Sequence, residues 1–141
     1  MKTFSLRTTR RAEMVDITRE VAKLVSGIGV KEGAAVVYIP HTTAGVTINE
    51  NADPDVVRDI LATLEKIVPR DGDYRHGEGN SDAHLKSAFL GHSVTIPVSG
   101  GLLALGAWQG IYFCEFDGPR TREVKVQVVK GNGGRESGGR G

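Results

Sequence analysis

The sequence contains little cysteine, few aromatic residues and no excess of charge of either sign. Its one cysteine, Cys114, excludes an intramolecular disulfide and a cysteine-based zinc cluster, and the apolar run around it predicts a buried, inert thiol. Lys and Arg number 18 against 17 for Asp and Glu, so the chain has no basic field that would hold nucleic acid without base-specific contacts. Nucleic-acid binding is therefore not expected.

Long apolar runs are also missing. The apolar stretch 34–39 is far shorter than the ~18–20 residues that a membrane helix requires. No signal-peptide apolar region follows the first four residues. We therefore expect a soluble, cytoplasmic protein that binds no membrane.

Glycine is abundant, with 19 residues in a chain of 141, which is the length of one ordinary domain. Six of these glycines fall in the last eleven residues, where no apolar side chain occurs. The sequence therefore predicts a single domain over residues 1–130 and a flexible, dispensable tail over 131–141.

The spacing of apolar residues predicts an α+β fold. Helical periodicity indicates one helix over 17–27, capped by Asp16, and a second helix from the cap Asp53 to about Pro69. A third, short helix is expected over 81–91. The predicted strands cover 3–9, 13–15, 34–39, 46–48, 93–98, 110–116 and 121–129. Because these strands alternate as half-buried antiparallel strands do, and no phosphate-loop motif occurs, we expect an antiparallel β-sandwich core rather than a nucleotide-binding sheet.

Polar residues that could perform chemistry concentrate in three stretches, 41–43, 49–53 and 74–86. The first two follow predicted strands and the third leads into a predicted helix. Rigid elements commonly present functional side chains at such positions. We therefore expect the three stretches to converge on one pocket.

The first two stretches suggest anion binding and proton transfer. His41 stands beside the hydroxyls of Thr42 and Thr43, as in an acid–base or anion site, although a histidine at a strand end also commonly bonds a backbone group. Glu50 and Asn51 precede a helix entrance whose free N–H groups favour an anionic ligand, although short polar residues are common before any helix cap.

The third stretch holds His76 and His84, with Asp82 two residues before His84 and Lys86 two residues after it. Asp82 could orient the His84 imidazole or share a metal with it, and Lys86 could contact a phosphate. A solvated charged loop is the alternative. No single zinc signature is present, so a metal site would need ligands that folding or a second subunit brings together. The candidate metal ligands are His41, His76 and His84.

Three motifs together resemble the YjbQ-like family, known as secondary thiamine-phosphate synthase enzymes. The motifs are HTTAGVTINENADP at 41–54, HGEGNSDAHLK at 76–86, and the strand 93–98 followed by GAWQGI at 106–111. The resemblance extends to about Val129, and the family pattern usually has Thr where this chain has Ala107. The candidate catalytic residues are His84, Asp82, His41 and Asn51, and the candidate substrate- or phosphate-binding residues are Thr42, Thr43, Lys86, Glu50 and Gln109.

The resemblance implies a homotrimer with pockets near subunit boundaries and a weak ability to join a pyrimidine methyl diphosphate to a thiazole phosphate, releasing pyrophosphate. The resemblance is also compatible with a bound divalent metal, zinc or magnesium, or a bound anion in the pocket. No organic cofactor is expected. The apolar strands 93–98 and 111–116 independently suggest a trimer, because two short helices would leave them partly uncovered.

The sequence is compatible with three functions. The first is an enzyme acting on a small phosphorylated metabolite, the second a zinc-dependent hydrolase, and the third a small-ligand binding or regulatory trimer whose catalysis is incidental. No motif for a protein nucleophile is present, which suits a reaction in which one substrate attacks the other directly.

Overall fold

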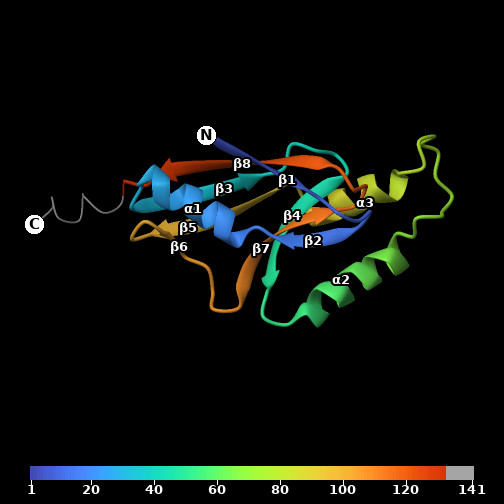
Figure 1. Ribbon diagram of the computed structural model, residues 1–141, viewed down its shortest axis with the longest axis horizontal. Coiled ribbons are helices and arrows are strands. Elements are labelled where there is room, and N and C mark those ends of the chain that lie inside the picture. The colour runs from blue at the N-terminus through green and yellow to red at the C-terminus, as the bar shows by residue number, and fades with distance from the viewer. Residues whose placement is uncertain (133–141) are drawn as a thin grey trace, which may run out of the picture.

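Two antiparallel sheets and three helices make up the fold in the computed structural model, which describes residues 1–132 (Figure 1). The strands are β1 (Lys2–Arg7), β2 (Glu13–Asp16), β3 (Glu32–Tyr38), β4 (Ala44–Glu50), β5 (Ser93–Ser99), β6 (Leu102–Leu103), β7 (Gln109–Glu115) and β8 (Thr121–Lys130), and the helices are α1 (Thr18–Ile28), α2 (Pro54–Ile67) and α3 (Ser81–Leu90). The predicted α+β class is confirmed. From residue 133 onward, the predicted tail lies outside the described residues.

The main core lies between the two sheets. One sheet has the strand order β1-β8-β3-β5-β6 and the other has the order β2-β7-β4. Alternate residues of each strand face inward, as Val37, Ile96 and Val126 do from the larger sheet. Phe113 of the smaller sheet and Val21 of α1 belong to the same buried cluster. Burial of each such side chain stabilises the fold by about 1.5–3 kcal/mol.

Local signals fix the helix ends. Asp16 accepts hydrogen bonds from the N–H and hydroxyl of Thr18 at 2.9 and 2.5 Å, so it caps α1 as predicted, one residue outside the formal cap position. Gly29, with a φ of 83°, ends α1. Asp53 accepts from the N–H of Asp55 at 2.9 Å, which confirms the predicted cap of α2.

One strand escapes sequence analysis. Leu102–Leu103 pairs with the end of β5 through a turn in which Gly100 and Gly101 have φ values of 60° and 81°. Two consecutive positive φ values are typical of a tight hairpin turn and favour glycine. A two-residue strand has no detectable period, so the sequence does not predict it.

Helix α2 packs loosely on a second, smaller cluster. Its side chains Val57, Leu61 and Leu64 lie against the buried Cys114 and Phe116, but no side chain of α2 is fully buried. The prediction of a buried Cys114 is confirmed, and burial raises the pKa of its thiol to about 12. Figure 1 shows α2 and α3 at the end of the molecule opposite the C-terminus.

Strand β7 is covered within a single copy of the chain, because every residue from Gly110 to Glu115 is buried. The expectation that this strand would need a partner copy to cover it is therefore wrong. Among the described residues, no helix has both the length and the apolar run needed to cross a membrane.

Candidate functional site

A hollow of about 360 Å³ lies at the start of α3. The rings of His76 and His84 lie on its wall, 5.2 Å apart between centroids and edge to face at 82°. His84 comes from the first turn of α3 and His76 from the loop before it, and Arg75 and Ser81 also line the hollow. The structure therefore brings together two of the predicted histidines and places a cationic side chain beside them.

The first turn of α3 has no side-chain cap. Asn80 occupies the cap position, but no side-chain hydrogen bond closes the helix start. The Asn80 amide donates instead to Oδ2 of Asp117 at 2.9 Å. Free N–H groups at a helix start, together with the helix dipole, favour an anion. The hollow therefore places imidazole and guanidinium groups, together with the carboxylate of Asp73, beside an uncapped helix start.

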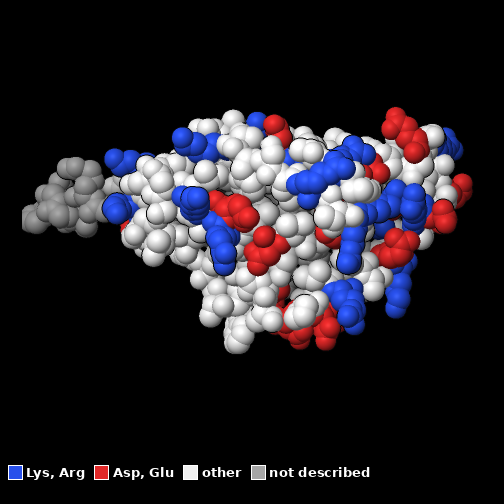
Figure 2. All heavy atoms as spheres, in the orientation of Figure 1, with Lys and Arg blue, Asp and Glu red and all other residues white. Residues whose placement is uncertain are grey.

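A second hollow, of about 470 Å³, adjoins the first. The two share Tyr74, His76 and Ser81, and the second also contains Arg70. The loop 70–80 thus surrounds the start of α3 on two sides. Figure 2 shows Lys and Arg side chains interspersed with Asp and Glu over this end of the molecule. The two hollows are therefore lined by charges of both signs, Arg70 and Arg75 together with Asp71 and Asp73.

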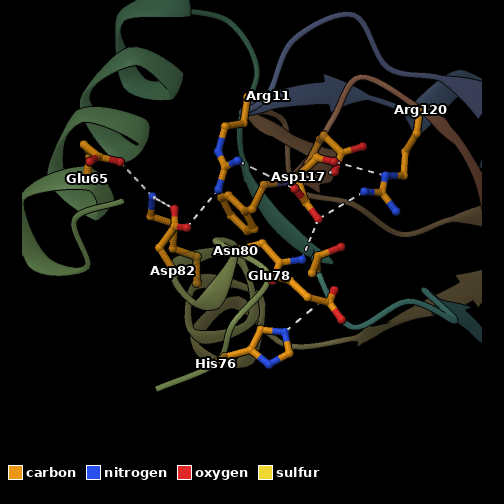
Figure 3. A network of polar contacts seen from close by, with 12 residues as sticks. Arg11, Glu65, His76, Glu78, Asn80, Asp82, Asp117 and Arg120 are labelled. Carbon is orange, nitrogen blue, oxygen red and sulfur yellow. Dashed lines mark hydrogen bonds and ion pairs between the residues drawn. The ribbon is translucent and has the colours of Figure 1, made fainter. Parts of the chain in front are cut away.

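Asp82 and Lys86 do not line the hollow and belong to an ion-pair network; Figure 3 shows Asp82 in this network with Arg11 and Glu65. The buried Asp82 carboxylate accepts from Arg11 at 2.8 Å through Oδ1 and from Nζ of Lys86 at 2.9 Å through Oδ2. Lys86 also donates to Oε1 of Glu65 at 2.8 Å, which holds the pKa of Glu65 below its usual value. Lys86 is therefore neutralised within the chain, between two carboxylates.

Asp82 does not contact His84 in the described chain. Residues 81–90 are helical, and positions two apart on a helix point in different directions. The expectation that Asp82 would orient the His84 imidazole depended on an extended backbone at this point. Asp82 instead fixes the helix that carries His84.

Thr43 lies in another network, buried around Arg122 of β8, and the half-buried His41 lies near it. Nε2 of His41 accepts from the N–H of Glu123 at 2.9 Å. Burial, and next the charge of Arg122, lower the pKa of His41. Arg122 donates to the Thr43 hydroxyl at 2.9 Å and to both carboxylate oxygens of Glu115. His41 is therefore held neutral, and the Thr43 hydroxyl already has an internal partner.

The remaining predicted residues lie elsewhere. Nδ2 of Asn51 donates to Oδ2 of Asp16 at 3.2 Å, and both line a separate hollow of about 580 Å³ beside the start of α1. The carbonyl of Glu50 accepts from the Tyr112 hydroxyl at 3.3 Å. Gln109 closes its own turn by accepting from the N–H of Gly106 at 2.8 Å. The exposed Thr42 contributes its carbonyl oxygen as an acceptor for Ser87 at 2.6 Å.

One copy of the chain thus separates Asn51 from the hollow at the start of α3. Asn51 precedes α2, whereas Glu65, near the other end of this 14-residue helix, contacts the α3 network, so α2 spans about 21 Å between them. Over residues 1–132, no group of three or more His, Cys, Asp or Glu side chains is placed to hold a metal ion. The set His41, His76 and His84 therefore does not fit a zinc ion within one copy.

Sequence reasoning missed Arg11, Asn80 and Arg122 as organising residues. Arg11 follows Arg10 in a polar loop, and nothing in its neighbours distinguishes a buried contact from a solvated charge. Arg122 does carry a signal, because it occupies an inward position of the alternating strand β8. A charge at such a position indicates a buried partner.

Comparison with known proteins gives one consistent family. Residues 2–131 match the family model described as UPF0047 protein YjbQ-like. The UPF0047 protein YugU of Bacillus subtilis is 52% identical over 130 residues, covering 92% of this chain and 98% of that protein. The UPF0047 protein MJ1081 of Methanocaldococcus jannaschii is 51% identical over 126 residues, 89% of this chain and 91% of its own.

Solved structures agree with the fold. A crystal structure of an uncharacterized protein of the YjbQ/UPF0047 family from Clostridium acetobutylicum superposes with a TM-score of 0.90 at 55% identity, covering 92% of this chain and all of that one. A protein of unknown function from Sulfolobus solfataricus superposes with a TM-score of 0.89 at 32% identity, over 92% of this chain and 96% of that one.

Proposed function

The chain belongs to the UPF0047 family of YjbQ-like proteins, as its motifs indicated, and we propose that it is a transferase acting on small phosphorylated metabolites. The reaction proposed joins a pyrimidine methyl diphosphate to a thiazole phosphate. The observation that carries the proposal is the uncapped start of α3, where Ser81 lies on a hollow that His76, His84 and Arg75 also line. These groups suit a diphosphate.

The chemistry requires little of the protein beyond charge neutralisation and positioning. The C–O bond to the diphosphate breaks, pyrophosphate leaves with the bonding electrons, and the thiazole ring nitrogen forms the new C–N bond to the same carbon. The pyrimidine ring delocalises the positive charge that develops on that carbon. The N–H group of Ser81, together with Arg75, would stabilise the departing pyrophosphate, and His84 would donate a proton to it.

The proposal includes assembly of the chain as a homotrimer. Leu85 and Phe89 are one helical turn apart on α3 and are 42% and 65% exposed, and Leu85 also lines the His84 hollow. An exposed apolar stripe beside a polar hollow is typical of a site at a subunit boundary. In such a trimer, Asn51 of a neighbouring copy would approach the His84 hollow, which it does not reach within its own copy.

Purified protein incubated with the two substrates tests the proposal. We expect formation of thiamine phosphate and an equal amount of pyrophosphate, and a loss of at least about 100-fold in His84→Gln, the lower end of the range for general acid–base catalysis. His92→Gln is the matched control, because His92 lies outside all three motifs. Both variants are assayed well below their melting temperatures.

Wild-type protein that forms no product contradicts the enzymatic proposal. In that case, tight binding of either substrate would support the alternative of a ligand-binding trimer. Equal activity in His84→Gln and His92→Gln would show that the active site does not include His84 of α3.

A further inference from the structure

Arg11 links two carboxylates that surround the start of α3 (Figure 3). It lies in the loop between β1 and β2, and its side chain is 25% exposed. One terminal nitrogen donates to Oδ1 of Asp82 at 2.8 Å, and the other lies 3.7 Å from Oδ1 of Asp117. A residue far away in the sequence therefore contacts both the first turn of α3 and the β7–β8 loop.

Each of these carboxylates holds a different part of the helix start. Asp82 is itself in the first turn, two residues before His84. Asp117 accepts from the Asn80 amide at 2.9 Å, and the withdrawal of that side chain leaves the cap position open. Arg11 thus restrains the helix turn that carries His84 and, through Asp117, the residue that would otherwise cap it.

Lys86 cannot replace Arg11 in this arrangement. Its ammonium group already bonds Oδ2 of Asp82 and Oε1 of Glu65. The Asp82 carboxylate is only 1% exposed, and without Arg11 its Oδ1 would lose its cationic donor. An unpaired buried carboxylate oxygen is unfavourable, and movement of the first turn toward solvent would relieve it.

We propose that Arg11 is a positioning residue for the α3 site: it acts through Asp82 and Asp117 to hold the open helix start and His84 in place. This inference rests on the proposed function for its catalytic readout. A second readout is independent of catalysis: the hollow lined by Ser81, His84 and Arg75 should bind inorganic pyrophosphate while Arg11 holds the helix start in place.

The test compares Arg11→Gln with Arg10→Gln. Arg10 is the adjacent residue, is exposed, and has no side-chain ion pair among residues 1–132, so it controls for loss of one positive charge. We measure pyrophosphate binding by calorimetry and kcat and KM for thiamine-phosphate formation, both well below the melting temperature. Arg11→Gln should lower kcat on the order of 10- to 100-fold and weaken pyrophosphate binding, whereas Arg10→Gln should change neither.

Arg11→Lys and a double-mutant cycle separate positioning from general stability. Lysine supplies one charge but not the planar fork that reaches two carboxylates, so Arg11→Lys should restore part of the lost kcat. If Arg11 acts through Asp82, the total loss of kcat in the double variant Arg11→Gln/Asp82→Asn should be smaller than the product of the losses in the two single variants.

Two results would overturn the inference. One is an Arg11→Gln protein whose kcat and pyrophosphate affinity match those of Arg10→Gln, whatever its melting temperature. The other is a fully multiplicative loss of kcat in the double variant. A wild-type protein that binds pyrophosphate without turnover would contradict the proposed function. The role of Arg11 would then be decided by the pyrophosphate affinities of Arg11→Gln and Arg10→Gln.

Discussion

Arg122 of β8 donates hydrogen bonds to both carboxylate oxygens of Glu115 of β7, and the two side chains are only 2% and 0% exposed. Thr8 donates to the same carboxylate at 2.8 Å, and Arg122 also donates to the Thr43 hydroxyl. The two strands belong to different sheets. The pair therefore connects the two layers of the fold and fixes the loop that follows His41.

Removal of one partner should destabilise the protein strongly. We expect Arg122→Leu to lower the free energy of unfolding by about 3–5 kcal/mol, because it leaves the Glu115 carboxylate buried without its cation. Urea unfolding followed by circular dichroism measures the change. The control is Arg120→Leu, whose half-exposed ion pair with Asp117 should contribute no more than about 1 kcal/mol. Equal losses in the two variants would contradict the assigned role of the pair.

The same carboxylate should make stability depend on pH. Burial alone would raise the pKa of Glu115, but hydrogen bonds from Arg122, from the N–H of Asp117 and from Thr8 outweigh it, so the pKa lies below its ordinary value of 4.5. A carboxyl whose pKa is lowered on folding stabilises the native state above its unfolded pKa, and this stabilisation is lost as pH falls through the folded pKa.

Unfolding free energies between pH 7 and pH 3 test this relation. The wild type should lose stability below about pH 4.5, and Glu115→Gln, although less stable at pH 7, should show a smaller loss over this range. Parallel curves for the two proteins would show that other carboxyl groups cause the pH dependence.

His41 should remain neutral at physiological pH. Burial and the neighbouring Arg122 both lower its pKa from the ordinary 6.5, and the Glu123 N–H donates to Nε2, which places the proton on Nδ1. The stabilisation from neutral His41 is therefore present above pH 6.5 and is lost as pH falls through the folded pKa. Nitrogen-detected NMR of the imidazoles should show an Nδ1–H tautomer at pH 7 and a titration midpoint below 6.5. A midpoint above 6.5 would contradict this prediction and would make His41 a candidate general acid.

The fold could be predicted where local sequence determines local structure. The Asp53–Pro54 start of α2 and the alternation in β8 are examples, since a cap or a period lies within a few residues of its effect. β6 could not be predicted, because its two residues pair only through the geometry of Gly100 and Gly101.

The site was predictable in its composition but not in its arrangement. The sequence places His76 and His84 at a helix entrance, where the structure has them side by side. It does not show that Asp82 bonds Arg11, 71 residues away, or that α2 separates Asn51 from both histidines. Long-range pairing of charges depends on the tertiary fold, and a polar loop has the same sequence pattern whether its charges are solvated or paired.

The exposed apolar stripe of α3 gives the test of assembly. If copies of the chain cover Leu85 and Phe89, a carboxylate at position 89 would be buried in an apolar contact, which is strongly unfavourable. We expect the wild type to show a light-scattering mass three times that of the 15.1 kDa chain, and Phe89→Glu to shift toward a single chain with its circular dichroism spectrum unchanged. Ser26→Glu, an exposed position on α1, is the matched control and should leave the mass at three chains.

A monomeric wild type would refute the trimer, whereas a trimeric Phe89→Glu would place the subunit contact on another face. Because Leu85 lines the His84 hollow, the dissociated variant should also lose thiamine-phosphate formation, whereas Ser26→Glu should keep it.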